Sequence, residues 1–479
     1  MSAADDPRRS APELPSGAVA PPRALGGSTA ILLIVASMIG AGVFTTTGFL
    51  VRDLGSTTAV LIAWGLGGLT ALCGALAYAE LAAALPHNGG EYSLLSRIYH
   101  PGVGFIAGWV SLIVGFSAPM AAAAIAFGEY LGRLFPSLDP TASGLTAILA
   151  LALLHGLRVR LGGLVQNVVT AATILLIVAF ILGGLAFGDY SRLTAVTDPK
   201  TLSALASPAF AVGLVYVSFA YSGWNAAAYI AGEVAEPSRS IPRALVKGTL
   251  LVTGLYLGLN LVFLVGAPAS ELAGQVEVGY IAAEHLFHAP LVTAGLTLIV
   301  ALGLLTTVSA LMMAGPRVYE ALGADYPRLR HLAQRLTQGT DNAIAEIAEI
   351  DSGLSPAAAE ATSAAGGRGP ATAIALQAVI AAAMMLTATF SDLLTYMGIT
   401  LALSSGLTVA GVFVLRRREP ALPRPYRTWG HPFTTLLALG LMSWMIIFTV
   451  AERPLTALFA AATLVAGLAL YLVVRPAKG

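Results

Sequence analysis

The feature that most constrains this chain is an uncharged, apolar run at residues 28–51 with two glycines, Gly40 and Gly42, at its midpoint. A helix of these 24 residues measures about 36 Å, enough to cross a bilayer core about 30 Å thick. Each glycine costs a helix about 1 kcal/mol relative to alanine. Opened backbone at this depth must be buried by protein or line a water-filled cavity. The run therefore predicts a membrane helix that breaks at its centre, or one whose glycines let a neighbouring helix pack closely.

The composition is that of a polytopic membrane protein. Charged residues make up 11% of the 479 residues, against about 25% in soluble domains, and the mean hydropathy is +0.79. The formal net charge of +1 gives no basis for binding nucleic acid. Residues 1–24 are rich in Pro and Ala and lack an apolar core, which predicts a disordered cytoplasmic tail rather than a cleaved signal peptide.

Breaks at Gly, Pro and charged residues divide the remainder into twelve apolar spans, so we expect an all-α protein with twelve transmembrane helices. The spans are residues 28–51, 56–84, 102–131, 141–157, 162–187, 208–234, 244–266, 290–315, 370–390, 392–415, 433–450 and 455–474. We also expect a helical loop at residues 271–288 and a mobile cytoplasmic loop at residues 326–369.

Positive charge predicts the orientation of these spans. When loops are assigned alternately to two sides, one side carries 21 of the 26 Lys and Arg residues. The other side carries Arg52, Arg133, Arg192, Lys200 and Arg453. Because basic loops stay in the cytoplasm, we expect a multi-pass protein of the cell (inner) membrane with both termini cytoplasmic.

A second interruption lies in the sixth span. Residues 219–225 (FAYSGWN) place Ser, Gly and Asn between aromatic residues at mid-span. Broken spans at equivalent positions of two five-helix halves predict a 5+5 inverted-repeat transporter with its site where the breaks meet. The predicted units are a tail at 1–24, a first repeat at 25–188, an inverted second repeat at 208–415, and helices 11 and 12 at 433–474.

The broken helix ends predict the chemistry of the ligand. Helix N-termini expose N–H groups that suit a carboxylate, and C-termini expose carbonyl groups that suit a cation. Two breaks therefore fit an α-amino acid. Glu129 and Glu233 fall near span ends, and no other acidic residue is placed to match a cationic side chain. This favours a neutral amino acid over an amine, a polyamine or a cationic amino acid.

A turn motif follows the second span, at residues 85–92 (LPHNGGEY). Pro86 and two glycines stop the helix and turn the chain. We expect Glu80 and Glu91, which flank this turn, to form a structural network at the cytoplasmic mouth. An enzyme is disfavoured because His155, the one histidine within a span, lies near the end of that span.

The sequence resembles the amino acid–polyamine–organocation (APC) superfamily, and within it the L-type amino acid transporters and their bacterial counterparts. The resemblance rests on residues 39–44 (IGAGVF), 80–92, 108–109 (GW), 219–225, 241–243 (IPR), 315–317 (GPR) and 425–430 (PYRTWG). It implies the leucine-transporter fold with broken helices 1 and 6. It also implies a secondary active transporter or exchanger of neutral L-amino acids that works by alternating access; a non-transporting amino-acid sensor on the same fold is left open.

The resemblance further implies which residues hold the substrate. They are Ile39, Gly40, Ala41, Gly42, Phe219, Ala220, Ser222 and Asn225. Amides of the first break would bind the substrate carboxylate, and carbonyl groups of both breaks would bind its ammonium group. Phe219 would be an aromatic gate, and Asn225 a polar group lining the site.

Two departures from the family pattern concern ions and partners. Many sodium-independent members have a lysine where this sequence has Thr173, and residues 161–188 contain no titratable group. Thr173, Thr306 and Thr307 either line a sodium site or bond carbonyl groups of their own helices. We expect no metal or cofactor other than Na⁺ as a candidate coupling ion. The loop at residues 132–141 lacks the cysteine that links mammalian members to a heavy subunit, so we expect no disulfide-linked partner.

Overall fold

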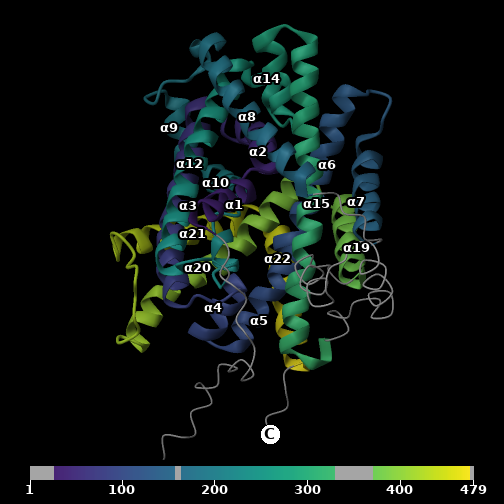
Figure 1. Cartoon of the computed structure of the whole chain (residues 1–479). Coiled ribbons are helices and arrows are strands. Elements are labelled where there is room, and N and C mark those ends of the chain that lie inside the picture. Colours follow the sequence, from purple (N-terminus) through teal and green to yellow (C-terminus); the bar gives the residue numbers. More distant parts are fainter. Residues whose placement is uncertain (1–25, 157–162, 233, 330–370, 475–479) are drawn as a thin grey trace, which may run out of the picture.

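The structure, a computed structural model, describes residues 26–156, 163–232, 234–329 and 371–474. These ranges form helices joined by turns and short loops, with no β-strand (Figure 1). The predicted tail at 1–24 and most of the predicted loop at 326–369 lie outside the described residues.

Helices lie in all twelve predicted spans. In chain order they are α1 (Gly27–Met38) with α2 (Ala41–Leu54), α3 (Thr57–Ala84), α5 (Pro101–Val110) with a π-helix (Ser111–Ser117) and α6 (Ala118–Leu134), α7 (Pro140–Gly156), α8 (Gly163–Phe187), α10 (Pro208–Ala220) with α11 (Ala226–Tyr229), α12 (Pro237–Gly266), α15 (Pro290–Asp325), α19 (Ala371–Thr387), α20 (Phe390–Arg418), α21 (Phe433–Glu452) and α22 (Pro454–Val474).

By length and hydropathy, seven helices of the described chain can cross a membrane, or nine if each of two bent pairs is one span. One bent pair is α1 with α2, and the other is α9 (Pro199–Leu205) with α10. Shorter apolar helices occur within α7, α8 and α19. The all-helical, multi-span prediction is confirmed, while the number twelve stays a prediction.

Short helices cover the two ends of the molecule. α4 (Gly90–Ile98) and α5 lie at one end, and α9 and α14 (Val278–Phe287) lie at the opposite end (Figure 1). α14, with α13 (Ala269–Leu272), accounts for the helical loop predicted at residues 271–288.

Helices from equivalent positions of the two predicted halves pack against each other. α3 packs on α12, α6 on α15 and α7 on α19, while α1 contacts α11 and α2 contacts α10. Small residues permit this closeness: a Cβ added at Gly68 of α3 would lie 2.5 Å from Cγ2 of Thr253 on α12.

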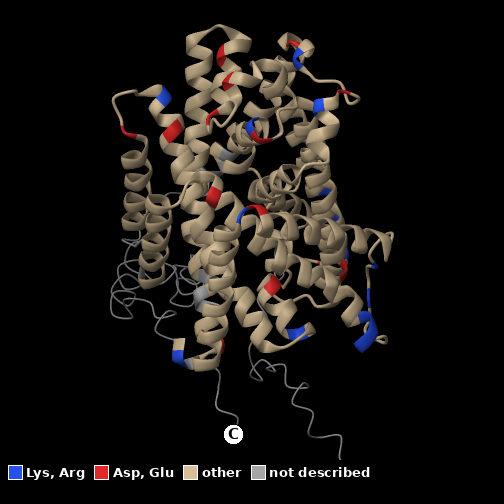
Figure 2. Cartoon of the chain, turned by 180° about the vertical axis from the view of Figure 1, so that it is seen from behind, with Lys and Arg blue, Asp and Glu red and all other residues tan. Residues whose placement is uncertain are grey.

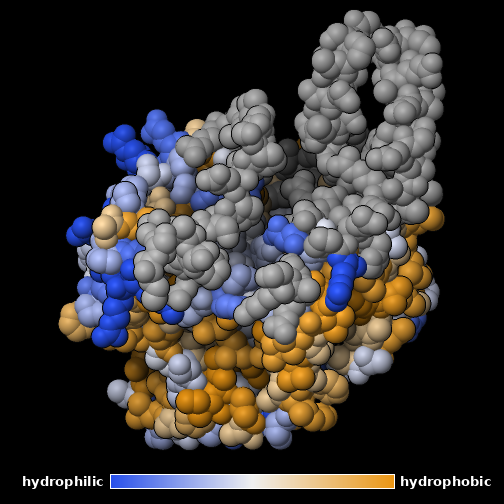
Figure 3. All heavy atoms as spheres, turned by 90° about the horizontal axis from the view of Figure 1, so that it is seen from below, coloured by the Kyte–Doolittle hydropathy of each residue, from blue (hydrophilic) through white to orange (hydrophobic). Residues whose placement is uncertain are grey.

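The outer surface is suited to lipid. Most of the helical surface carries neither basic nor acidic residues (Figure 2). Seen from below, hydrophobic residues cover one flank and hydrophilic residues gather along another margin (Figure 3). Large apolar side chains such as Leu175 of α8 and Leu455 of α22 are well exposed, which in an aqueous surface would be unfavourable.

Candidate functional site

The first predicted break is present between α1 and α2. α1 ends at Met38, α2 begins at Ala41, and the two helices are bent by 41°. Ile39 and Gly40 between them are extended, with φ/ψ of −72°/98° and −147°/−156°. Because terminal carbonyl and amide groups have no partner within their own helix, this break presents both kinds of group at one place.

The second predicted break follows α10. Residues 221–225 form turns, and α11 adds only four helical residues. Gly223 has a φ of +98°, and a Cβ added there would lie 2.5 Å from the Ser37 carbonyl oxygen. Glycine is therefore required both for its backbone conformation and for its contact with α1.

The helical part of the sixth span is shorter than the 208–234 predicted, because its end bonds to another segment. The Gly89 amide donates to the Tyr229 carbonyl over 3.1 Å, and the Gly232 amide donates to Asn88 Oδ1 over 2.9 Å. These bonds tie the chain to the turn after α3 in place of a further helical turn.

The two breaks touch each other. A Cβ added at Gly42 would lie 2.4 Å from Cα of Ala220. The Tyr256 hydroxyl, on α12, is shared between the carbonyl oxygens of Met38 and Ala220, the latter at 3.1 Å. Sequence reasoning missed Tyr256; its only signal was a phenol within the apolar span at 244–266.

A cavity of about 2500 Å³ adjoins both breaks. All of the predicted site residues border it: Ile39, Gly40, Ala41, Gly42, Thr173, Phe219, Ala220, Ser222, Asn225, Thr306 and Thr307. The cavity extends to the exposed residues His87, His100 and Arg418, so it reaches the surface at the α4–α5 end.

The opposite end of the site is covered. The Gly274 amide, between α13 and α14, donates to the Gly48 carbonyl of α2 over 2.7 Å. The Tyr130 hydroxyl of α6 donates to the Phe44 carbonyl over 2.8 Å and accepts from the Gly279 amide over 3.2 Å. These contacts close α2 off from the α9–α14 end, so the structure is open on one side only.

The three predicted threonines border the same part of the cavity. The hydroxyl of Thr173 donates to the Val169 carbonyl over 2.9 Å, and those of Thr306 and Thr307 donate to the Gly303 carbonyl over 2.8 and 2.9 Å. A Cβ added at Gly303 would lie 3.1 Å from Thr173 Oγ1, so α8 and α15 face each other here. The bonds within each helix leave hydroxyl lone pairs for another donor or a cation, and both interpretations of these residues stay open.

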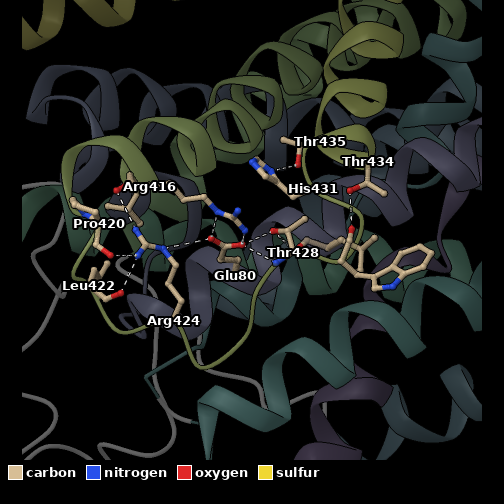
Figure 4. A network of polar contacts seen from close by, with 12 residues as sticks. Glu80, Arg416, Pro420, Leu422, Arg424, Thr428, His431, Thr434 and Thr435 are labelled. Atoms are coloured by element: carbon tan, nitrogen blue, oxygen red, sulfur yellow. Dashed lines mark hydrogen bonds and ion pairs between the residues drawn. The ribbon is translucent and has the colours of Figure 1, made fainter.

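Glu80 forms the first of two polar networks near the mouth (Figure 4). Its side chain is 2% exposed and binds Arg416 through two hydrogen bonds of 2.8 and 2.7 Å. The Thr428 amide and hydroxyl donate to the same carboxylate over 2.7 and 2.8 Å, and Arg424 Nε lies 3.5 Å from it. The expected structural network is therefore present, and it joins α3, the end of α20 and the loop that follows.

Glu91 forms the second network, with uncharged partners. Its carboxylate accepts hydrogen bonds from the Tyr78 hydroxyl, from Asn225 Nδ2 at 3.0 Å, and from the hydroxyls of Ser404 and Ser405. Asn225 is thus held by Glu91 at the point where it lines the cavity.

The cations and phenols of the mouth have other partners. Arg97 of α4 pairs with Glu419 over 2.6 Å. The Tyr92 hydroxyl donates to Asp325 at the end of α15. Burial, followed by this hydrogen bond and the Asp325 charge, raises the pKa of Tyr92, which keeps its hydroxyl protonated as a donor.

Residues 25–471 match the family model described as amino acid permease. The chain belongs to the amino acid permease family. Its membership of the APC superfamily is confirmed, and the chain is a permease rather than an enzyme.

Named relatives of this permease are amino acid transporters. The human large neutral amino acids transporter small subunit 2 is 27% identical over 95% of this chain and 81% of its own. The serine/threonine exchanger SteT of Bacillus subtilis (strain 168) is 27% identical over 86% of this chain and 87% of its own. The human b(0,+)-type amino acid transporter 1 is 27% identical over 90% of this chain and 83% of its own.

Proposed function

We propose that this permease moves neutral L-amino acids across the plasma membrane by alternating access, as a secondary active transporter or exchanger. The observation that carries the proposal is the contact between two helix breaks beside a large cavity, at Gly42 and Ala220. The names of its relatives, which include a transporter of large neutral amino acids and a serine/threonine exchanger, support the same substrate class.

The substrate is held by backbone groups of the two breaks. The first amides of α2, at Gly40, Ala41 and Gly42, bind the substrate carboxylate, because a helix N-terminus carries free N–H groups and partial positive charge. Carbonyl groups at Ile39 and at residues 219–222 bind the ammonium group. Phe219, which is 5% exposed and borders the cavity, is the gate, and Asn225 lines the site.

A neutral side chain fits the polar groups around the breaks. Glu91 is the carboxylate that bonds a predicted site residue, and its oxygens already accept four hydrogen bonds from the protein. It is therefore not free to receive the cationic side chain that an amine, polyamine or basic amino acid would bring.

The architecture we propose has twelve spans, in two inverted five-helix repeats followed by two further helices. Packing of α3 on α12, α6 on α15 and α7 on α19 supports the repeat, since each pair joins equivalent helices. Both termini are cytoplasmic, and the basic residues Arg97, Arg416 and Arg418 lie at the α4–α5 end. The cavity then faces the cytoplasm.

The permease works without a disulfide-linked subunit. Cys73 is the only cysteine of the sequence, and it is buried in α3 with 2% exposure. It therefore has no surface position from which to link to a partner chain.

Uptake into proteoliposomes tests this function. We expect accelerated exchange of labelled neutral amino acids, competed by other neutral amino acids and unaffected by lysine or putrescine. Uptake of the basic compounds alone would overturn the substrate class, and binding without uptake would identify a sensor. The same assay with and without a sodium gradient tests the threonines: if Thr173, Thr306 and Thr307 bind Na⁺, then Thr173→Ala removes any sodium stimulation. Sodium-independent uptake that is normal in Thr173→Ala would exclude that site.

A further inference from the structure

Glu91 is a buried carboxylate with no cationic partner. It is 3% exposed, borders the cavity, and no Lys, Arg or His nitrogen lies within 4.0 Å of it in the part of the chain that the structure describes. Burying an unpaired carboxylate is costly even when neutral donors surround it. This cost disappears when the group binds a proton.

The charged and titratable groups on the elements around Glu91 are occupied elsewhere. On α4, Arg97 pairs with Glu419 and Tyr92 bonds Asp325; on α20, Arg416 pairs with Glu80 and Arg418 bonds the Ile98 carbonyl; on α3, Tyr78 donates to Glu91 itself; the Tyr229 ring of α11 lies close by; and at the start of α5, His100 accepts from the Gly102 amide. A proton is therefore the available counter-charge.

The surrounding network can hold both protonation states. The ionised carboxylate accepts from all four donors. When it is protonated, its own O–H donates to Ser404 or Ser405, because a serine hydroxyl rotates freely and has lone pairs to accept. The proton arrives from water in the cavity, adds to one carboxylate oxygen, and returns to water on release; only that O–H bond forms and breaks.

We propose that Glu91 is a proton-binding site of the transport cycle, in the place of a lysine on the fifth span. The inference rests on the proposed transport function. It gives coupling a mechanical route, because the carboxylate ties α4 to Asn225 at the helix 6 break and to α20. Hydrogen bonds to an ionised group are roughly twice as strong as neutral ones, so protonation loosens this tie where alternating access needs movement.

Transport in proteoliposomes tests the inference with two readouts, counterflow exchange and accumulation driven by a pH gradient acidic outside. A gradient of about one pH unit drives at most about tenfold accumulation for one proton per substrate. We expect the wild type to accumulate substrate and to acidify a lumenal pH dye. Glu91→Gln still exchanges substrate but neither accumulates it nor acidifies the lumen, while Glu91→Asp, which keeps the carboxylate, retains both. Glu419→Gln, at an exposed ion pair, is the matched control and behaves as the wild type.

The outcomes separate this inference from the proposed function. Wild-type protein without counterflow for any amino acid would overturn both. Counterflow without a response to the pH gradient, or accumulation by Glu91→Gln equal to wild type, would overturn the proton site alone. If Glu91→Gln does not fold, the double variant Ser404→Ala, Ser405→Ala removes two donors to the ionised form and should shift the pH profile of accumulation to higher pH; an unshifted profile would contradict the proposal.

Discussion

Single atoms decide whether the two helix breaks can meet. At Gly42, the hydrogen in place of a side chain lets α2 lie against the last residue of α10, and at Gly223 it lets the turn after α10 lie against the Ser37 carbonyl. Tyr256 then bridges carbonyl groups on both sides with one hydroxyl. The site is therefore assembled from backbone groups, with few side chains that contribute directly.

Gly42→Ala should weaken substrate binding about 10- to 100-fold, because an added Cβ lies 2.4 Å from the Ala220 backbone and overpacking typically costs about 1–3 kcal/mol. Gly42→Val should abolish binding. Gly254→Ala, on α12, is the matched control, since an added Cβ meets nothing within 4 Å there. Binding of a labelled amino acid to purified protein measures both, and equal affinity in the two alanine variants would contradict the site.

At the scale of elements, short polar networks hold helix ends that the apolar core does not specify. Glu80 joins the end of α3 to the end of α20 and to Thr428 in the following loop (Figure 4). The carboxylate is 2% exposed whereas Arg416 is 30% exposed, so the pair is buried on one side.

Glu80→Gln should lower the thermal stability of the purified protein clearly, since removing one partner of a buried pair costs about 3–5 kcal/mol and Arg416 is only partly buried. Glu419→Gln should change it little, because the Arg97–Glu419 pair is exposed and such pairs contribute about 0–1 kcal/mol. Unfolding of both variants in detergent gives the comparison. Equal shifts in melting temperature would show that the Glu80 network does not stabilise the fold.

At the scale of the whole molecule, the cavity opens at the α4–α5 end and is covered at the α9–α14 end. In the orientation predicted from basic loops, this is a conformation that faces the cytoplasm. Transport then requires the contacts over α2, such as that between Gly274 and Gly48, to open as the mouth closes.

Cysteine labelling tests this orientation. In a Cys73→Ala background, Val196→Cys lies 60% exposed between α8 and α9, and Trp429→Cys lies 75% exposed after α20. A membrane-impermeant maleimide should label Val196→Cys on intact cells and Trp429→Cys only after permeabilisation. The Cys73→Ala protein itself should stay unlabelled. The opposite pattern would invert the proposed topology.

The sequence by itself determined what depends on short stretches of chain. Apolar length, the glycines at 40 and 42 and the polar cluster at 219–225 act locally, so they predict spans and interruptions without knowledge of neighbours. The family followed from the same local motifs, and so did the residues around the cavity.

Only the tertiary structure decided which distant groups meet. Ser404 is 313 residues from Glu91, and Tyr256 is 218 residues from Met38; no local periodicity connects such pairs. Arg97, near Glu80 and Glu91 in sequence, pairs instead with Glu419 across 322 residues. Hydropathy places a helix in the membrane, but the partner of each polar group depends on packing, because in a bundle of similar apolar helices many arrangements bury equal apolar area.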